Sequence, residues 1–182
     1  MAGLRKASAY SKRSVTPFTR TSKKRTKSYI KTLPPHKVVK FEMGKVSEFK
    51  QGKFPYVMTV LAAEDFQIRH NALEACRQFI NKKLEKETNG QYMFKIAPYP
   101  HHVQRENKML TGAGADRLQS GMQLSYGKSM NKAAILKKGK KIFILGLPTS
   151  KIEVFARKVI KQVNSKIPGK ININSEKIKA SK

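Results

Sequence analysis

The chain has 182 residues, and its 39 Lys and Arg side chains outnumber 11 Asp and Glu side chains to give a formal net charge of +28. This length suits one domain with a tail, and the charge favours a polyanionic partner, because neutralising phosphates with Lys and Arg releases condensed counterions. No apolar run approaches the ~20 residues of a membrane-spanning helix, the first 30 residues lack the apolar stretch of a secretory signal, and the single cysteine, Cys76, excludes an intramolecular disulfide and fits a reducing cytosol.

Residues 1–31 are predicted to form an extended basic tail. They contain ten basic residues, no acid, and many Ser and Thr side chains. Such a segment buries too little apolar area to offset the entropy cost of ordering, so we expect it to be disordered when alone in water. Its length and its lack of acidic residues favour binding to nucleic-acid phosphates. The alternative is a solvated tail without a function. The candidate phosphate contacts are Arg5, Lys6, Lys12, Arg13, Arg20, Lys23, Lys24, Arg25 and Lys27.

A stiff Leu33-Pro34-Pro35 segment leads into the predicted domain. Two strands are expected at 37–46 and 56–63, because both stretches are rich in Val, Phe and Met. Gly52 and Pro55 mark the turn between them.

The next segment predicts a helix over residues 65–88. Asp65 is the expected N-cap, and Asn89-Gly90 supplies the stop, with Gly90 able to adopt a left-handed backbone. Cys76 lies on the apolar side and is interpreted as a small core residue rather than a nucleophile. The apolar stripe at helical spacing consists of Ile68, Ala72, Cys76, Phe79, Ile80 and Leu84.

After a strand at 92–97, periodicity disappears over residues 98–122. A connection of that length within a compact domain is usually functional or disordered. A strand pair is then expected at 132–137 and 141–147, turned at 138–140.

A second helix is predicted over residues 150–165, where Ser150 and Glu153 have the spacing of a capping box. A closing strand follows at 170–174. Strands mixed with two amphipathic helices indicate an α+β fold, a two-layer sandwich in which a mixed, mainly antiparallel sheet carries both helices on one face.

Two glycine motifs fail as nucleotide-binding signatures. Gly127-Lys128-Ser129 resembles the end of a P-loop, but Met122 occupies the required earlier glycine position, and no apolar strand precedes the motif. Gly112-Ala113-Gly114-Ala115 lacks the preceding strand of a dinucleotide fingerprint. This small segment more simply allows close packing or a change of shape.

Metal and acid–base readings also fail. His101-His102 has no third ligand at suitable spacing, so stacking or phosphate contact fits these histidines better. Glu106 and Asp116 have arginine neighbours, which makes local ion pairing a simpler explanation than catalysis. We therefore expect no enzymatic activity, no cofactor and no metal.

The 98–122 segment is predicted to probe a crowded polyanionic site. It contains Arg105, Lys108 and Arg117 beside glycines that permit close approach, and Lys128 follows shortly after it. The alternative is a disordered surface loop.

The same segment carries a resemblance to a known family. Residues 99–109 (YPHHVQRENKM) continue into 111–117 (TGAGADR), followed by Gly121-Met122 and Gly127-Lys128. Together with residues 40–44 (KFEMG), 71–75 (NALEA) and 81–86 (NKKLEK), they closely resemble the archaeal and eukaryotic large-subunit ribosomal protein called L ten e, whose bacterial counterpart is L sixteen. The resemblance extends from about Leu33 to Ile173, and the short C-terminus is similar to the archaeal members.

This resemblance implies a hammerhead-like β element within the α+β core. It implies a cytoplasmic protein of the 50S subunit that contacts 23S-type rRNA, lies near 5S rRNA and borders A-site tRNA, with neighbouring large-subunit proteins and assembly factors as further partners and no membrane or homo-oligomer. The family's loop toward the peptidyl transferase centre corresponds to His101, His102, Arg105, Asn107, Lys108, Gly112, Gly114 and Arg117, and Lys128 joins the rRNA-binding candidates.

The chain departs from the family at two places. Ser129-Met130-Asn131 replaces a Pro and a following Gly, and Gln123-Leu124 replaces basic residues. The expected organisation is a basic tail at 1–31, one α+β domain at 32–176 with its loop at about 98–122, and a basic end at 177–182.

Two other classes of protein remain as alternatives. A DNA-compacting basic protein would be a free dimer that binds duplex, and the sequence contains no helix-turn-helix or zinc pattern to support it. An RNA-modifying enzyme would need a cofactor pocket, which the glycine motifs do not supply.

Overall fold

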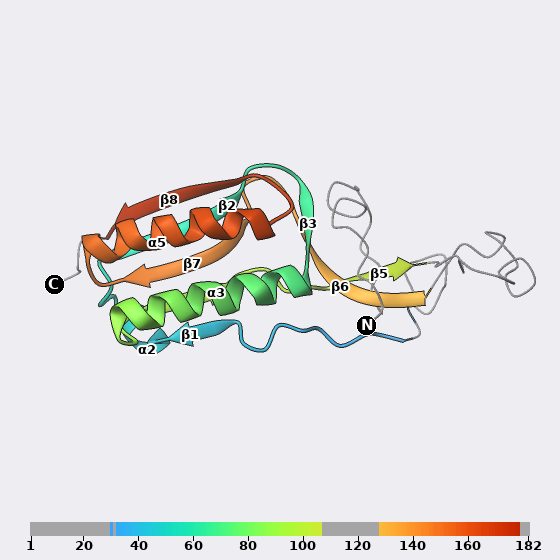
Figure 1. The fold of residues 1–182 in the computed structure, drawn as a ribbon, viewed down its shortest axis with the longest axis horizontal. Coiled ribbons are helices and arrows are strands. Elements are labelled where there is room, and N and C mark those ends of the chain that lie inside the picture. The colour runs from blue at the N-terminus through green and yellow to red at the C-terminus, as the bar shows by residue number, and fades with distance from the viewer. Residues whose placement is uncertain (1–29, 31, 107–127, 179–182) are drawn as a thin grey trace, which may run out of the picture.

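The computed structural model describes residue 30 and residues 32–106 and 128–178 (Figure 1). In chain order the elements are β1 (Glu42–Gly44), α2 (Val46–Lys50), β2 (Tyr56–Ala62), β3 (Phe66–Arg69), α3 (His70–Thr88), β4 (Met93–Ile96), β5 (His102–Glu106), β6 (Lys128–Leu136), β7 (Lys141–Leu147), α5 (Ser150–Val163), the short 3-10 helix η1 (Asn164–Lys166) and β8 (Ile171–Lys177).

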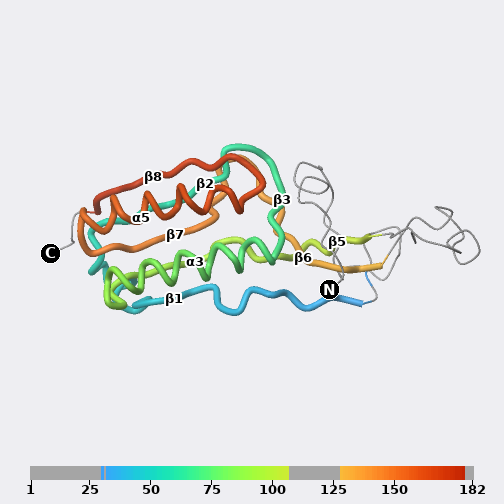
Figure 2. Tube along the Cα trace, viewed as in Figure 1, coloured from blue at the N-terminus to red at the C-terminus, as the bar shows by residue number. Residues whose placement is uncertain are grey.

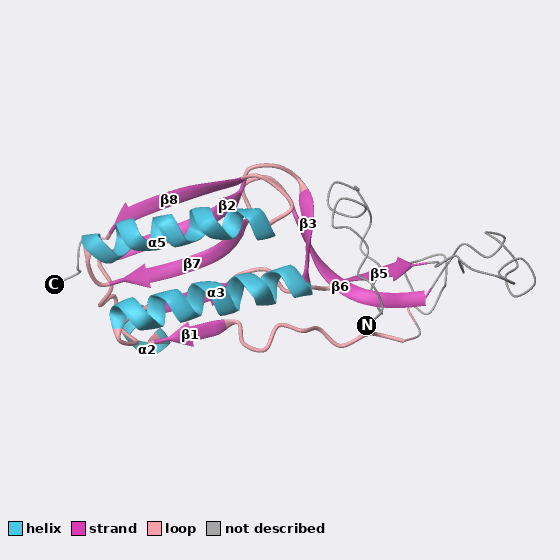
Figure 3. Ribbon diagram, viewed as in Figure 1, coloured by secondary structure: helices cyan, strands magenta, loops and turns pink. Residues whose placement is uncertain are grey.

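The main sheet contains five strands in the order β1-β4-β7-β2-β8, and every pairing in it is antiparallel. Helices α3 and α5 lie side by side on one face of this sheet (Figure 3). Alternation along β2 matches this arrangement, because Met58, Val60 and Ala62 are buried while the residues between them are partly exposed. The predicted α+β, two-layer fold is therefore confirmed.

The core lies between the two helices and the sheet. Phe94 and Phe143 are fully buried on neighbouring strands, with ring centroids 5.6 Å apart. Ile80 and Leu84 of α3 are also completely buried. Cys76 has 0% exposure, and burial raises the pKa of its thiol to about 12. The prediction that Cys76 is a core residue rather than a nucleophile is therefore confirmed, since the thiolate is the reactive form.

A second sheet of three strands, in the order β3-β6-β5, extends from one end of the main sheet (Figure 2). Its middle strand, β6, continues into β7 through the turn at Gly139, whose φ of +81° fits a glycine. The turn predicted at 138–140 is confirmed. Strand β6 begins at Lys128, four residues before the predicted start, because its first residues pair with β5, whereas β3 pairs with its last four residues.

The predicted start of the first helix was wrong. Residues 66–69 form β3, and α3 begins at His70. Phe66 pairs with Leu136 and Ile68 with Ala134, so sheet pairing prevails over the helical spacing of Ile68. Asp65 does not cap the helix, and its Oδ1 instead accepts a hydrogen bond of 2.8 Å from the Lys138 N–H. The predicted stop is confirmed, because Asn89 and Gly90 have φ values of +48° and +81°.

Three other predicted elements differ in detail. Only residues 42–44 of the stretch 37–46 form a strand, and helix α2 follows at once. The cap of α5 is Thr149 rather than Ser150, since the Thr149 side chain accepts from the Ile152 N–H at 3.5 Å. The closing strand β8 continues to Lys177, beyond the predicted end at residue 174, because it pairs with the whole length of β2.

Candidate nucleic-acid interface

Part of the predicted 98–122 loop is a strand, because residues 98–101 are irregular but the next five are not. Residues 102–106 form β5, which pairs with β6 from His102↔Ala133 to Glu106↔Lys128. The sequence concealed this strand because His102 and Gln104, although polar, are both buried, at 6% and 3% exposure. Gln104 Nε2 donates to Gln67 Oε1 at 3.3 Å, which gives the buried amide nitrogen a partner.

The chain therefore leaves the second sheet at Glu106 and returns to it at Lys128, and these two residues are paired neighbours. Whatever lies between them is attached at the outer end of an antiparallel ladder. Lys128, the predicted rRNA contact, is exposed there. Lys128 and Ser129 begin a strand and not a helix, so they do not fit a P-loop.

The two predicted histidines have different environments. His101 is exposed, whereas His102 is buried, and burial together with Arg105 lowers the pKa of His102 to about 4. His102 is therefore neutral at pH 7 and does not supply charge to a phosphate. Arg105 is half-buried on β5. The remaining predicted loop residues, Asn107, Lys108, Gly112, Gly114 and Arg117, lie outside the described residues, as do the nine predicted tail contacts from Arg5 to Lys27.

A third histidine, His70, is buried at the start of α3 with 1% exposure. Burial, followed by the charge of Lys37, lowers its pKa to about 4, with His36 and Lys132 acting in the same direction. The Asn131 side chain lies near the ring and acts to raise the pKa of His70. Neither ring nitrogen of His70 has a partner within hydrogen-bonding distance and angle.

Four aromatic rings form a group that sequence reasoning missed, which we call the aromatic ladder: His36, Phe41, Tyr99 and His101. Phe41 and Tyr99 stack with centroids 5.4 Å apart, and His101 lies 4.5 Å from Tyr99. His36 meets the edges of both Phe41 and Tyr99, at 5.8 and 5.2 Å. Tyr99 is 41% exposed, so part of its ring is available to stack on a base.

The surroundings of the aromatic ladder are basic. Lys37 and Lys40 are exposed in the same leading segment, residues 32–41. A base stacked on Tyr99 would thus have cations nearby for its phosphate. Part of this arrangement was visible in the sequence, because Lys37 and Lys40 lie between the rings of His36 and Phe41. Nothing in the sequence showed that residues 99–101 join them.

Glu74 holds the leading segment against α3. Its Oε2 accepts from the Val39 N–H at 3.2 Å and from Arg77 Nε at 2.8 Å, while Oε1 accepts from Arg77 Nη2 at 2.6 Å and from Gln78 Nε2 at 3.1 Å. The hydrogen bonds from Arg77 keep the pKa of Glu74 below its usual value. Ser129 Oγ donates to the Thr32 carbonyl at 2.9 Å and fixes the other end of the segment to β6.

Two other kinds of site are absent from the part of the chain that the structure describes. No group of three His, Cys, Asp or Glu side chains within 32–106 and 128–178 is placed to hold a metal ion. Among those same residues, no helix has the length and apolar character to cross a bilayer. Exposed rings beside lysines, together with the exposed Lys128 at the outer end of the β5–β6 pairing, suit contact with a polyanion such as nucleic acid.

Comparison with known proteins gives the family. Residues 17–174 match the family described as ribosomal protein L16p/L10e. The large ribosomal subunit protein uL16 of Staphylothermus marinus is 41% identical over 166 residues, covering 91% of this chain and 89% of the relative. The uL16 proteins of Sulfolobus acidocaldarius and Methanococcus aeolicus are each 40% identical, the first covering 91% of this chain and 89% of the relative, the second 81% and 83%.

The chain belongs to the ribosomal protein L16p/L10e family. The resemblance inferred from residues 33–173 and the expectation of a ribosomal protein that is not an enzyme are both confirmed.

Proposed function

We propose that this chain is a structural constituent of the large ribosomal subunit in the cytoplasm, where it binds 23S-type rRNA near 5S rRNA and helps to position A-site tRNA near the peptidyl transferase centre. Family membership and the net charge of +28 support the ribosomal role. The reaction itself belongs to RNA, and the protein contributes placement of the substrate.

The pairing of Glu106 with Lys128 is the observation that carries the positioning role. It attaches residues 107–127, which include Lys108 and Arg117, to a rigid ladder instead of to a free-standing connection. The two ends of this segment, Glu106 and Lys128, are held on regular elements, which fixes the place from which its cations can reach a ligand. The tail cations at residues 5–27 would neutralise rRNA phosphates and provide affinity instead of placement.

The pairing of β5 with β6 also allows the positioning role and the rRNA-binding role to be tested separately. Because Glu106 and Lys128 are paired neighbours, a two-residue Asn-Gly turn can replace residues 107–127 without breaking the sheet. We expect this variant to enter large subunits but to impair binding of A-site tRNA. A variant lacking residues 1–29 is expected to bind rRNA more weakly, with a salt dependence flatter by roughly one unit of slope per lost phosphate contact.

Sedimentation of a cell lysate tests the function as a whole. The wild-type chain should be recovered with 50S and 70S particles. Recovery mainly away from these particles would refute the ribosomal role and favour a general nucleic-acid-compacting protein. Normal A-site tRNA binding by the Asn-Gly variant would refute the positioning role alone.

A further inference from the structure

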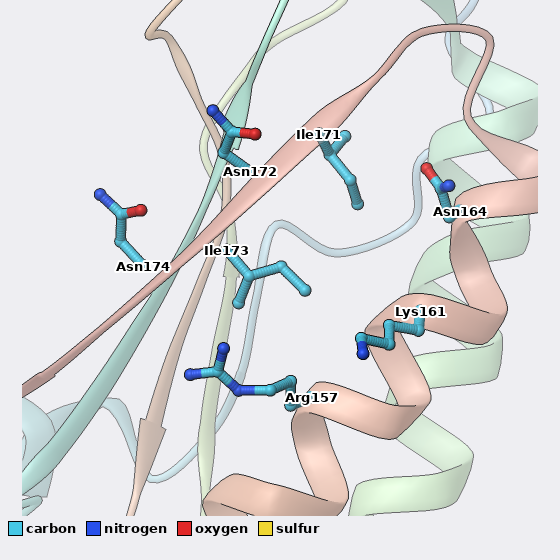
Figure 4. A pocket seen from close by; sticks show the side chains of 7 residues that line it. All are labelled: Arg157, Lys161, Asn164, Ile171, Asn172, Ile173 and Asn174. Carbon is cyan, nitrogen blue, oxygen red and sulfur yellow. The ribbon is translucent and has the colours of Figure 1, made fainter.

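A cavity of about 480 Å³ lies between helix α5 and strand β8 (Figure 4). Ile171 and Ile173 point from β8 toward the helix and form its apolar side, while Arg157 and Lys161 extend from α5 toward the strand. Asn164 stands at the end of the helix. The volume falls within the range of pockets that bind small ligands.

Strand β8 is the outer strand of the main sheet and leaves one backbone edge beside this cavity. The Ala63 N–H donates to the Lys170 carbonyl at 2.9 Å, and the Ile178 N–H donates to the Pro55 carbonyl at 2.8 Å. Hydrogen-bonded and non-hydrogen-bonded pairs alternate along an antiparallel ladder. The even-numbered residues of β8 therefore face β2, and the N–H and C=O groups of Ile171 and Ile173 point away from it, toward the open edge.

The charge of the cavity is positive. Arg157 and Lys161 are one helical turn apart, and none of the seven lining residues is acidic. Glu153 is the carboxylate that Arg157 contacts, with 3.4 Å between Nη2 and Oε1, and the same oxygen accepts from Ser175 Oγ at 2.6 Å. Glu153 thus ties β8 to α5 and orients the guanidinium, which keeps most of its five donors for a ligand.

We propose that this cavity binds one unpaired nucleotide of ribosomal RNA, with its base against Ile171 and Ile173 and a phosphate on Arg157 and Lys161. The proposal rests on the ribosomal role given above and assigns it a specific contact. Proteins that recognise RNA sequence target bases that are unstacked and splayed out. An apolar wall satisfies the face of such a base, and the free backbone groups of β8 can pair with its edge.

A peptide strand from a neighbouring protein is the other occupant that an open sheet edge could take, and the observations favour it less. Positive side chains along an edge oppose the addition of another strand. Here Arg157 and Lys161 line the cavity beside the strand, and Lys170 and Lys177 flank its two ends. Arg and Lys together suit a phosphate, which the Arg fork can bind through two parallel hydrogen bonds.

Site-directed cross-linking on the large subunit tests the proposal with the full chain. Cys76 is completely buried and its thiol pKa is raised to about 12, so a new exposed cysteine can be alkylated selectively. Asn164→Cys, and separately Asn172→Cys, would carry an azidophenacyl group at the rim of the cavity. The labelled chain is added to large subunits that lack the protein, and cross-linked nucleotides are mapped by primer extension after irradiation.

We expect both labels to cross-link to the same short stretch of rRNA. Adding Arg157→Gln and Lys161→Gln should abolish this cross-link while the chain still sediments with the subunit. The matched control is Lys82→Gln with Lys86→Gln, which removes two exposed charges one turn apart on α3 and should leave the cross-link unchanged.

The possible failures are distinguishable. Cross-links to a protein, no cross-link, or rRNA cross-links that persist in the Arg157/Lys161 variant would overturn the nucleotide site while leaving the ribosomal role intact. If the unlabelled wild-type chain does not sediment with large subunits, the ribosomal role and the nucleotide site both fall.

Discussion

Replacing His70 with Gln should change how the stability of the folded chain depends on pH. The His70 side chain is 1% exposed, and its pKa is lowered from 6.5 to about 4 by burial and by the nearby charge of Lys37. As the pH falls below 6.5, the unfolded chain takes up a proton at this position, whereas the folded chain does not until the pH approaches 4. The folded state therefore loses stability as the pH falls through this window.

The size of the effect follows from the two pKa values. One unit of pKa difference corresponds to about 1.4 kcal/mol. The whole effect is then about 3 kcal/mol, and about 2 kcal/mol of it falls between pH 7 and pH 5. His102, with a pKa also lowered to about 4, adds a separate contribution of the same sign that the His70→Gln variant retains.

Urea unfolding at pH 7 and pH 5 measures this difference, with far-ultraviolet circular dichroism as the signal because the chain has no tryptophan. The wild type should lose about 2 kcal/mol more than His70→Gln between the two pH values. Carboxylates also titrate near this range, but they are common to both proteins and cancel. An equal loss in wild type and His70→Gln would refute the assignment of a buried neutral histidine.

Three further substitutions test the fold and the interface. Gly44→Ala should destabilise the chain far more than Gly139→Ala, and thermal denaturation compares the two variants. Both glycines have positive φ, for which alanine costs roughly 1–2 kcal/mol. Of the two, only Gly44 would bring its new Cβ against a backbone atom, 2.0 Å from the Tyr92 carbonyl oxygen. Glu74→Gln should lower the free energy of unfolding in urea by about 2 kcal/mol, because it removes a charged acceptor of four hydrogen bonds. The control Glu42→Gln, in an exposed pair with Lys95, should lower it by less than about 1 kcal/mol. Equal losses would contradict the importance of the Glu74 network. Tyr99→Leu should weaken binding of single-stranded RNA by roughly 1–3 kcal/mol, and because it also removes three ring contacts of the aromatic ladder, urea unfolding is measured beside binding. Val39→Ala, at a position 71% exposed outside the aromatic ladder, is the control in the same fluorescence anisotropy titration, and unchanged affinity of the Tyr99 variant would exclude stacking there.

Helix ends, turns and the spacing of apolar residues in α5 could be predicted from the sequence, because they depend on residues close together in the chain. The end of α3 at Asn89-Gly90 and the turn at Gly139 need left-handed backbone, which Gly and Asn adopt most readily. Helix α5 followed from its apolar spacing, although its cap moved by one residue to Thr149. These features depend on neighbours in the sequence and were accessible for that reason.

Contacts between distant segments account for what the sequence did not reveal. Ile68 has helical spacing from Ala72 but lies on β3, because its strand partner Ala134 is 66 positions further along the chain. Strand β5 was hidden because its inward-facing His102 and Gln104 are polar and break the expected alternation. The aromatic ladder joins residues 36–41 to 99–101, a contact that no local pattern contains.

Alkylation of the buried Cys76 thiol can be used to measure how often the core opens. A thiol with 0% exposure and a pKa near 12 does not react with an alkylating reagent while the core is closed. Because the chain has one cysteine, every alkylated molecule has opened its core at least once. The alkylation rate therefore reports the frequency of that opening, and comparing free chain with subunit-bound chain would show how strongly the surrounding RNA keeps the core closed.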